Sequence, residues 1–525
     1  MAQKKLKFTL AALVASLSLH AAAEDNIFYW GSTTDPQTMD PYAVNTAPVW
    51  GFLTNVYEGL MRRTETGGVE PQLAKSWEPL SGEQPGWRFK LREGVNFHNG
   101  SPFNADDVIF SFQRATDENS DIRGMLASIK EVVKIDDYTI DLYTYEVDPV
   151  LPFSISGWAM FDKEWSEENN TTQPAREAEN YATLHTNGTG PFMVEKRSPD
   201  VETTLVANPN WWNERTFNID RAVFKPVADA ATGAAGLTSG ELDFFQPIAL
   251  QDIDDINNRN GVHTVEGLEG RAIMLGFNHE ADTLWGTDTP NPFKDQRVRQ
   301  AVYKAIDTDA IIQKIMRGKA QPTSQIDAPV VNGYTQGLER LPYDIDAAKA
   351  LLAEAGYTDG FEFTLRCPND RYINDEDVCK AVVSLLGKIN VKAKLDAIPV
   401  REYWGELRND NFDMFLLGWT PDTFDAEHPI RYLVTTPNPE LKFGDWNYGG
   451  YSNPRIDELL FAIRSELDQD KRQTLLDESA MIIRDDAAYI PLYVQPIAWG
   501  VRDGIEVKIR PDNYLHLKWV NKEKK

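Results

Sequence analysis

The most specific local pattern in the chain is FKLREGVNFHNGSPFNADDVIFSFQR, at residues 89–114. Its first part, FKLREGVNFHNG, predicts a strand, a glycine turn and a short strand, because glycine readily adopts the backbone conformations of tight turns. We expect Arg92, His98 and Asn99 to satisfy local hydrogen bonds in this turn. The segment is therefore predicted to be scaffold, and we do not place His98 in a ligand site.

The segments on either side of this pattern differ in character. The first 200 residues contain strand-like stretches separated by turns, such as YTIDLYTYEV, which predicts an α+β subdomain. Farther along, the helical spacing of apolar residues after Asp375 predicts a helix with Asp375 as its N-cap, and the alternating VKAKLDAI at 391–398 predicts a strand. A further helix is expected from Asp295 to about Gly318, with a break near Asp307. Helices alternating with strands predict an α/β layer.

Acidic residues dominate the charge of the chain. The 80 Asp and Glu residues against 53 Lys and Arg give a net charge of −27 at pH 7. Such a surface repels phosphate backbones, so we expect no nucleic-acid partner. A length of 525 residues predicts two to four domains, since a domain usually has about 100 to 200 residues. We expect these domains to interleave in a monomer.

The N-terminus has the three parts of a secretory signal peptide. Lys4, Lys5 and Lys7 precede an apolar run at 8–19, and three alanines at 21–23 follow it. We expect cleavage after Ala23, and we expect the exported chain to be periplasmic. Because no cysteine follows the cleavage site, a lipoprotein is not expected.

Both cysteines of the chain, Cys367 and Cys379, lie in the part expected to be exported. An oxidising compartment allows a disulfide, and two free thiols would be a liability there. We therefore predict that they pair.

Catalytic signatures are absent from the sequence. It contains no phosphate-binding loop, no paired CxxC, no GxSxG and no HExxH motif. Its histidines are scattered, so no metal site is predicted. We therefore predict a protein that is not an enzyme and that needs no cofactor.

Further strings complete a resemblance to a known family. They are MDPY (39–42), VYEGLM (56–61), EPQLAKSWE (70–78), GTGPF (188–192), NPNWW (208–212), PFKDQRVRQAVYKAID (292–307), YDIDAAKALLAEAGY (343–357), GWTPD (418–422) and GYSNPRIDELL (450–460). With residues 89–114, this order resembles the family 5 extracellular solute-binding proteins of ABC importers, which include dipeptide- and oligopeptide-binding proteins. The resemblance covers nearly the whole chain after residue 23.

The resemblance implies a type II periplasmic-binding-protein fold, with two α/β lobes, a hinge and an extra α+β subdomain in the first lobe. The expected boundaries are 1–23 for the signal peptide, 24–56 and 201–275 for lobe I, 57–200 for the extra subdomain, 276–480 for lobe II and 481–525 for a return to lobe I. It also implies a function: closure of the hinge captures a short peptide, which is delivered to a membrane permease.

The first candidate site follows the apolar run FDMFLLGW at 412–419, which predicts a buried strand. Ligands of open α/β sheets bind beyond the carboxyl ends of strands, where Trp419 and Asp422 lie. The family's peptide binders carry an acidic residue at the matching place of a GWTxD string, where it pairs with the ligand's ammonium group. The resemblance gives this role to Asp422, although Asp425 or Glu427 could take it instead.

The second candidate site is the loop RCPNDRYIND at 366–375. Arg371 could bind a ligand carboxylate through two hydrogen bonds, and Tyr372 or Asn374 could contact the ligand backbone. Alternatively, Arg371 pairs with Asp370 or Asp375 and has no ligand role.

The ligand itself has an alternative. A chitin-type oligosaccharide would favour stacking on Trp419 and Trp446, and another small polar solute is also compatible with the fold.

Overall fold

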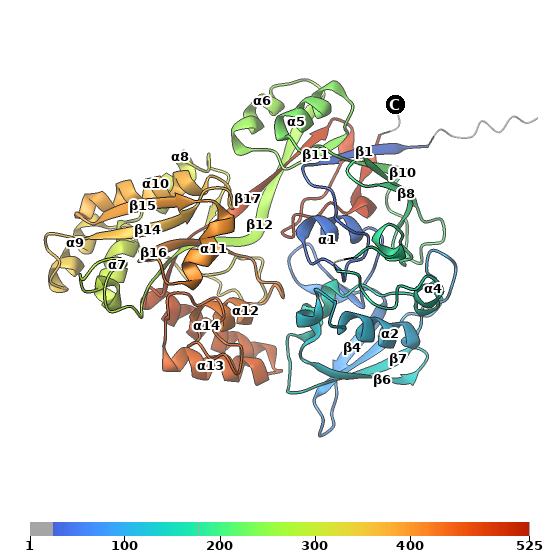
Figure 1. The fold of residues 1–525 in the computed structure, drawn as a ribbon, viewed down its shortest axis with the longest axis horizontal. Coiled ribbons are helices and arrows are strands. Elements are labelled where there is room, and N and C mark those ends of the chain that lie inside the picture. The colour runs from blue at the N-terminus through green and yellow to red at the C-terminus, as the bar shows by residue number, and fades with distance from the viewer. Residues whose placement is uncertain (1–24, 177, 524–525) are drawn as a thin grey trace, which may run out of the picture.

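The computed structural model describes residues 25–176 and 178–523. The signal peptide expected at residues 1–23 lies outside the described residues. Two lobes lie beside each other, and one large mixed sheet runs through both of them (Figure 1). The expected fold class, two α/β lobes with an extra α+β subdomain, is confirmed.

The large sheet places strands from distant parts of the chain next to one another. Its order is β15 (Lys392–Ile398), β14 (Glu362–Pro368), β16 (Met414–Trp419), β12 (Val262–Phe277), β17 (Tyr489–Arg502), β11 (Phe244–Gln246), β1 (Ile27–Ser32), β10 (Arg221–Pro226), β9 (Glu202–Ala207) and β8 (Phe192–Ser198), and β13 (Gln321–Pro322) pairs with β17. Within it, β14 is parallel to β15 and β16, and β1 is parallel to β10 and β11. β15, β14 and β16 belong to lobe II and the last five strands to lobe I, while β12 and β17 pass through both.

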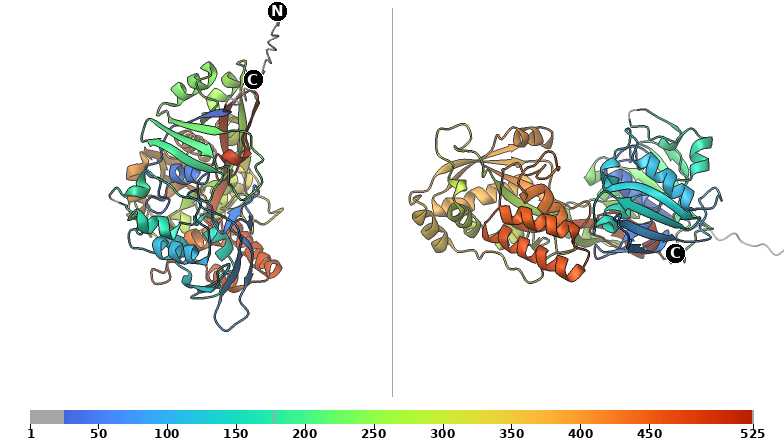
Figure 2. Two further views of the ribbon diagram at one scale, coloured as in Figure 1. Left: turned by 90° about the vertical axis from the view of Figure 1, so that its right-hand side faces the viewer. Right: turned by 90° about the horizontal axis from the view of Figure 1, so that it is seen from below.

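The helices are divided between the lobes, which Figure 2 shows from two further sides. Lobe I and its subdomain contain α1 (Ala47–Leu53), α2 (Ala105–Ala115), α3 (Leu151–Ser154), α4 (Lys163–Glu168), α5 (Ala230–Ser239) and α6 (Ile253–Asn257). Lobe II contains α7 (Gln296–Ala305), α8 (Thr308–Lys314), α9 (Ile345–Glu354), α10 (Asp375–Leu386), α11 (Val400–Arg408), α12 (Glu427–Pro429), α13 (Pro454–Ser465) and α14 (Gln469–Asp485). No helix of the described ranges is long and apolar enough to cross a membrane.

The extra subdomain has its own small antiparallel sheet, with the order β4 (Ala74–Pro79), β5 (Gly86–Leu91), β7 (Thr139–Thr144) and β6 (Ile129–Asp136). The pattern at 89–114 spans the end of β5, a turn and α2. Asn104 begins α2 with a capping box, in which Asp107 binds back to the Asn104 amide. His98 contacts the backbone of Gly188 and Gly190, so this segment is scaffold. Because β8 pairs within the large sheet, we place the end of the subdomain near residue 190.

Helix and strand periodicity located the elements of lobe II well. The helix predicted after Asp375 is α10, and the strand predicted at 391–398 is β15. The long helix expected from Asp295 breaks into α7 and α8 around Asp307, as predicted. The cap of α10 differs from the prediction: Asn374 holds that position with φ of 54°, and Asp375 is the first helical residue.

Two long strands join the lobes. Residues Val262–Leu268 of β12 pair with Pro496–Arg502 of β17 in lobe I, and Ala272–Gly276 pair with Tyr489–Val494 in lobe II. The register shifts between Leu268 and Ala272, so that three residues of β12 lie opposite Gln495. This interruption of the strand pairing marks the hinge.

The C-terminal segment returns to lobe I after β17. Its β18 (Ile505–Glu506) pairs with β19 (Asn521–Lys522), and the hairpin of β2 (Met61–Arg63) and β3 (Val69–Pro71) lies near it in lobe I. Leu515, Leu517 and Val520 are buried in the same core as Phe52. Packing of this segment into lobe I brings its polar residues to the surface that faces lobe II.

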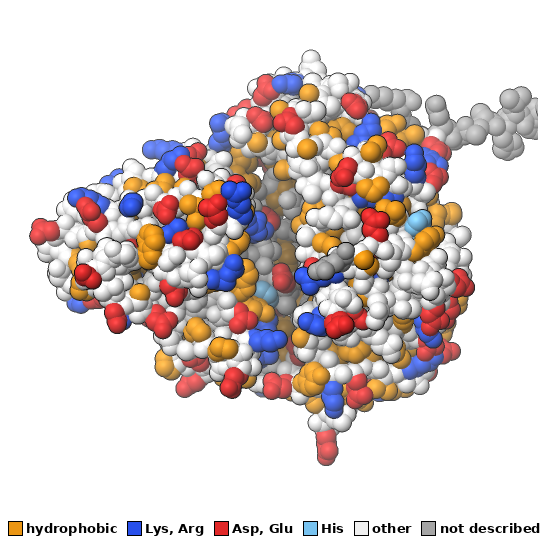
Figure 3. Space-filling view, viewed as in Figure 1, with side chains coloured by type: hydrophobic (Ala, Val, Ile, Leu, Met, Phe, Trp, Pro, Cys, Tyr) orange, Lys and Arg blue, Asp and Glu red, His pale blue; other side chains and the backbone are white. Residues whose placement is uncertain are grey.

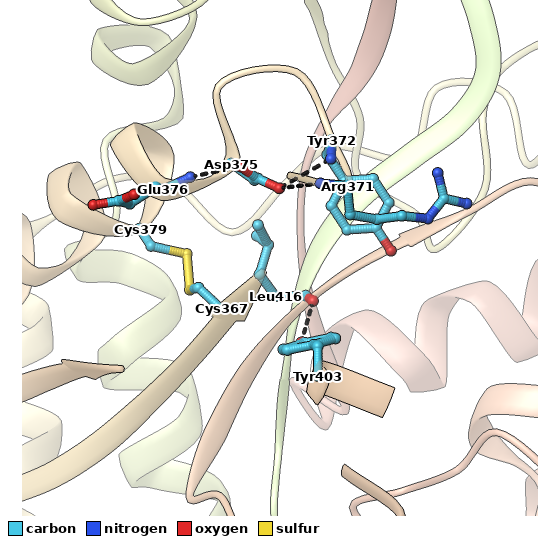
Figure 4. The surroundings of a disulfide bond; sticks show 8 residues. All are labelled: Cys367, Arg371, Tyr372, Asp375, Glu376, Cys379, Tyr403 and Leu416. Atoms are coloured by element: carbon cyan, nitrogen blue, oxygen red, sulfur yellow. Dashed lines mark hydrogen bonds between the residues drawn. A yellow bond between two sulfur atoms is a disulfide. The ribbon is translucent and has the colours of Figure 1, made fainter. Parts of the chain in front are cut away.

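A disulfide joins β14 to α10. Cys367 and Cys379 are bonded, as predicted, across a sequence separation of 12 residues, and both are fully buried (Figure 4). The bond closes the loop that carries Arg371, and it anchors both ends of that loop to rigid elements.

We expect replacement of Cys367 and Cys379 by Ser to lower the free energy of unfolding by ~3 kcal/mol, because the cross-link restricts the unfolded chain. Urea unfolding monitored by tryptophan fluorescence measures the loss. Wild-type protein unfolded with and without reductant is the control. Equal midpoints for oxidised, reduced and substituted protein would contradict this account.

Candidate functional site

A cleft of about 1180 Å³ separates the lobes. Figure 3 shows the surface hollowed between the lobes, with Lys and Arg side chains along its borders. The lining residues come from both lobes and from the hinge, in the ranges 41–72, 121–159, 269–271, 420–472 and 510–519, together with Arg371. A solute in this cleft would therefore contact both bodies at once.

Asp422 lies in the loop that follows β16, on the lobe II wall. Its side chain is 92% exposed, and its nearest basic group is Nε2 of His428 at 3.9 Å. Burial lowers the pKa of His428 to about 3, so this neighbour is neutral. The surrounding walls raise the pKa of Asp422, while Arg63, Arg271 and Arg431 act against that rise. In the described structure, Asp422 thus presents a carboxylate with no charged partner within ion-pair distance.

Asp425 has a different environment, although it is only three residues away. It is fully buried, and both of its oxygens accept hydrogen bonds from Arg472, at 2.6 and 2.9 Å. Asn332 and the backbone amide of Glu427 donate to it as well. These partners occupy the acceptor positions of the Asp425 carboxylate. Asp425 therefore stabilises the fold of lobe II and is not available to a ligand in the cleft.

Glu427 is also buried, but it faces two arginines on the lobe II wall. Its Oε1 lies 3.3 Å from Nε of Arg431 and 3.5 Å from Nε of Arg464. Burial raises the pKa of Glu427, and the two guanidinium groups counteract this. Of the three acids that the sequence left open, Asp422 is the one whose carboxylate reaches the cleft without a protein cation as partner.

Arg371 lies beside the cleft on the loop between β14 and α10. Its side chain points away from the disulfide (Figure 4) and rests 5.2 Å from the ring of Tyr372. The carboxylate of Asp375 accepts hydrogen bonds from the backbone amides of Arg371 and Tyr372, and the carboxylate of Asp370 accepts one from the backbone amide of Val400. Neither acid forms an ion pair with the Arg371 guanidinium, which has no acidic partner in the part of the chain that the structure describes.

The other predicted contacts of this loop are turned inward. Tyr372 is 7% exposed, and its hydroxyl lies 3.4 Å from the carbonyl oxygen of Gly418. Asn374 donates through Nδ2 to the carbonyl of Ile315 at 3.1 Å. Both residues support the loop from behind, whereas Arg371 is the member that lines the cleft.

Trp419 and Trp446 belong to an aromatic cluster behind the cleft wall. Their ring centroids are 5.5 Å apart, and Trp419 is 9% exposed. His428 and Tyr432 separate Trp419 from the open cleft, with centroids 5.5 and 6.0 Å from its ring. Nε1 of Trp419 has no hydrogen-bond partner among the described residues. The cluster therefore supports the wall from behind, and neither Trp419 nor Trp446 is among the residues that line the cleft.

The floor of the cleft is the hinge itself. Glu269 pairs with Arg271 at 3.0 Å and accepts a hydrogen bond from Gln495 at 2.6 Å. The side-chain oxygen of the same Gln495 accepts a hydrogen bond from the backbone amide of Ile373 at 3.3 Å. The loop that carries Arg371 is thus bonded to the hinge strands.

Arg63 bridges the two lobes. It extends from β2 of lobe I and donates to the carbonyls of Asp422 and Thr423 in lobe II, at 2.7 and 2.8 Å. Its guanidinium also lies 4.6 Å from the ring of Phe424, which packs against Gly270 of the hinge. Burial lowers its pKa to about 10, so Arg63 remains charged at neutral pH. The loop of Asp422 is consequently held from the opposite lobe.

Sequence reasoning did not find the lobe I wall. Arg62, Arg63, Arg510, Tyr514 and Lys518 all line the cleft there. The available signal was the concentration of basic and aromatic residues in IRPDNYLHLKW at 509–519, within a chain of strongly negative charge.

The model of the family described as bacterial extracellular solute-binding proteins, family 5 Middle, matches residues 68–440. The chain belongs to the family 5 solute-binding proteins. Members of this family are solute-binding components of ABC importers and are not enzymes. The resemblance seen in the sequence is thereby confirmed.

Relatives within family 5 bind different solutes, according to their names. Heme-binding protein A of Haemophilus influenzae is 27% identical, with 93% of this chain and 94% of that protein covered. Di/tripeptide-binding protein 1 of Pseudomonas aeruginosa is 27% identical, with 94% of each covered. Glutathione-binding protein GsiB of Salmonella typhimurium is 26% identical, with 93% of each covered.

Solved structures share the fold. HbpA2 from Haemophilus parasuis gives a TM-score of 0.82 at 24% identity, covering 95% of this chain and all of that one. The periplasmic murein tripeptide-binding protein MppA, in an unliganded open form, gives 0.79 at 19% identity, covering 95% and 97%.

The family 5 fold in this chain separates two acids that are close in sequence. We expect Asp425→Asn to lower the free energy of unfolding by ~3–5 kcal/mol, because Arg472 would remain buried without its partner. Asp422→Asn should change it by less than about 0.5 kcal/mol, since its side chain is exposed. Thermal and urea unfolding of both variants provide the measurement. Similar losses in the two variants would contradict the assigned environments.

Proposed function

We propose that this chain is the periplasmic solute-binding component of an ABC importer and that it captures short peptides with free termini. Asp422 pairs with the ligand's ammonium group, and Arg371 pairs with its carboxylate. The observation that carries this proposal is the presence of one unpaired carboxylate and one unpaired guanidinium on the lobe II side of the same cleft. A zwitterionic peptide supplies the complementary charges, and each pair offsets the cost of removing a charge from water.

Two further features support a mobile carrier. The cleft lies between lobes joined by β12 and β17, and the loop of Arg371 is bonded to that hinge. The proposal includes export through a signal peptide at 1–23, no lipid anchor, a monomeric state and delivery of the ligand to a membrane permease. Each of these rests on the sequence and on membership of the family.

Glutathione falls within the same ligand class, because it is a tripeptide with a free amino group and two carboxylates. The name of the Salmonella relative supports including it in any screen. The name of the Haemophilus relative supports haem as another solute to be screened.

The oligosaccharide alternative has less support from the geometry. Neither Trp419 nor Trp446 is among the residues that line the cleft, and the two rings contact each other edge to face, so neither ring is placed for stacking on a sugar in the cleft. A thermal-shift screen of peptides, glutathione, haem and chitin-type oligosaccharides separates these classes. Ligand at about 100 times its dissociation constant stabilises the bound form by ~2.7 kcal/mol.

We expect N-acetylation or C-amidation of a bound peptide to weaken binding to wild-type protein, because each removes one charged end. Asp422→Asn should weaken binding of the free peptide by ~2–5 kcal/mol and should abolish the effect of acetylation. Arg371→Met should do the same for amidation. Isothermal titration calorimetry measures all these affinities.

Glu440→Gln is a matched control, because it removes an exposed acid of the same cleft that lies outside the proposed pair. It should leave the affinity nearly unchanged. If blocked and free peptides bind wild-type protein equally well, the assignment of Asp422 and Arg371 is wrong.

Ligand should compact the protein. Because a peptide that contacts both lobes binds the closed state better than the open one, the population shifts toward closure. Small-angle X-ray scattering should give a smaller radius of gyration with peptide than without, and mass spectrometry should recover the peptide unaltered. The Asp422→Asn, Arg371→Met double variant, measured at the same peptide concentration, should keep the larger radius. An unchanged radius at saturation would contradict hinge closure.

A further inference from the structure

The lobe I wall contains a cluster of basic side chains around one indole ring. Trp519 has the ammonium of Lys518 at 4.7 Å, the guanidinium of Arg510 at 5.0 Å and the ammonium of Lys508 at 5.5 Å from its ring centroid. The imidazole of His516 lies 4.9 Å away. We call Arg510, His516, Lys518 and Trp519 the Trp519 cluster, and all four residues line the cleft.

Carboxylates are scarce around these basic groups. Asp512 pairs with Arg510 at 2.9 Å and lies 3.7 Å from His516. Lys518 is 7% exposed, yet its ammonium has neither a carboxylate within 4.0 Å nor a hydrogen bond among the residues described. The side chain of Lys518 is thus largely buried, while its ammonium is not fully enclosed and is left at the cleft wall without a partner from the part of the chain that the structure describes.

Other donors of the cluster are unsatisfied too. Nη1 of Arg510 and both ring nitrogens of His516 are buried without a hydrogen-bond partner in the described ranges. Arg510 itself is 4% exposed. Burial lowers the pKa of His516 to about 4, so its ring is neutral and only one of the two nitrogens is a donor. Buried polar groups in folded proteins are nearly always hydrogen-bonded, so the unsatisfied donors of Arg510 and His516 on one side of the cleft indicate that an acceptor enters from the cleft.

The charged groups around Lys518 favour the binding of an anion. Burial first, and then Arg62 and Arg510, lower the pKa of Lys518 to about 7, while Glu58 and Glu70 oppose the change. Glu70 is already paired with Arg62, at 2.5 Å. Glu58 is buried and accepts hydrogen bonds from Trp212 and Thr189, among others. Among the described residues, neither acid lies within ion-pair distance of the Lys518 ammonium, and Glu70 is already neutralised by Arg62.

We propose that the Trp519 cluster is a second anion subsite of the cleft, which binds a carboxylate on the ligand's side chain and selects short peptides that contain Asp or Glu. The proposal rests on the proposed function, because Asp422 and Arg371 on the other wall take the two ends of the peptide. The side chain between those ends is then available to the lobe I wall. Closing of the cleft would bring the two walls onto one ligand.

The test compares isosteric peptides that differ in one charge. Tripeptides Ala-Glu-Ala and Ala-Gln-Ala have the same shape, and calorimetry at pH 7 should show at least about tenfold tighter binding of the Glu peptide, which is the scale of a hydrogen bond between charged groups. Lys518→Met should remove this preference, and Lys518→Arg should keep it. Equal affinities of wild-type protein for the two peptides would overturn the subsite.

Lys508 supplies a matched control for the charge. Its ammonium lies beside the same indole ring but is exposed and paired with Glu65 at 2.6 Å. Lys508→Met removes the same charge from the same ring and should leave the preference for Glu unchanged. If Lys508→Met and Lys518→Met reduce the preference equally, the effect is one of general charge and the subsite is overturned.

The pH dependence gives an independent readout. Lys518 loses its proton as the pH rises through about 7, so the preference of wild-type protein for Glu over Gln should fall between about pH 6 and about pH 9. In Lys518→Arg the guanidinium stays charged, so the preference should stay constant across this range. A constant preference in wild-type protein would overturn the role of Lys518.

A last probe separates the subsite from the proposed function. N-acetylglutamate has no ammonium group for Asp422, and its binding should raise the pKa of Lys518 in NMR titrations of wild-type protein. If no peptide binds but N-acetylglutamate raises this pKa, the proposed function fails and the subsite stands. Inorganic phosphate that raises it while N-acetylglutamate does not would overturn the assignment to carboxylates.

Discussion

The interruption of strand pairing between β12 and β17 is the constraint on which the two-lobed structure depends. Both strands pass from one lobe to the other, and their backbone groups must stay hydrogen-bonded where they are buried. Pairing continues on both sides of the interruption, with a second register shift between Ile273 and Met274, and between Leu268 and Ala272 other bonds replace it. Gly270 donates its amide to the carbonyl of Pro511, and Gln495 binds Glu269. Bending can therefore concentrate at a few residues while each lobe keeps its own sheet.

The same hinge supports both charged loops of lobe II. The Arg371 loop is bonded through Ile373 to Gln495, and the Asp422 loop places the ring of Phe424 against Gly270. Arg63 then links the Asp422 loop to lobe I. A peptide bound by Arg371 and Asp422 would thus contact two loops that are attached to the hinge strands, which must bend when the lobes close. If a peptide binds as proposed, short chains of hydrogen bonds and ring contacts would couple its binding to closure of the lobes, without any need for a long-range pathway.

Most of the fold was predictable because it is encoded locally. Apolar spacing located α10, alternation located β15, and the break between α7 and α8 was visible near Asp307. Asp422 could be proposed from the sequence because it follows the apolar run of β16, and Arg371 because it lies in the loop between β14 and the helix of Cys379. The lobe I wall could not, because Arg62 and Lys518 meet only when the C-terminal segment packs into the lobe I core. No periodicity records a contact between residues so far apart in the chain.

The three acids of PDTFDAEH show why the role of a carboxylate cannot be deduced from its spacing. Phe424 has φ of 51°, and this turn directs Asp425 inward, where Arg472 from α14 meets it. Glu427 meets Arg431 and Arg464, while Asp422 has no such partner and stays in the cleft. Arg431 is close to Glu427 in sequence, but Arg464 and Arg472 come from α13 and α14, so distant arginines contribute to deciding which carboxylate remains free. In a chain with a net charge of −27, the recognition proposed here depends on the few charged groups that the fold leaves without an ion-pair partner among the described residues. Asp422 and Arg371 meet that criterion on one wall, and Lys518 meets it on the other.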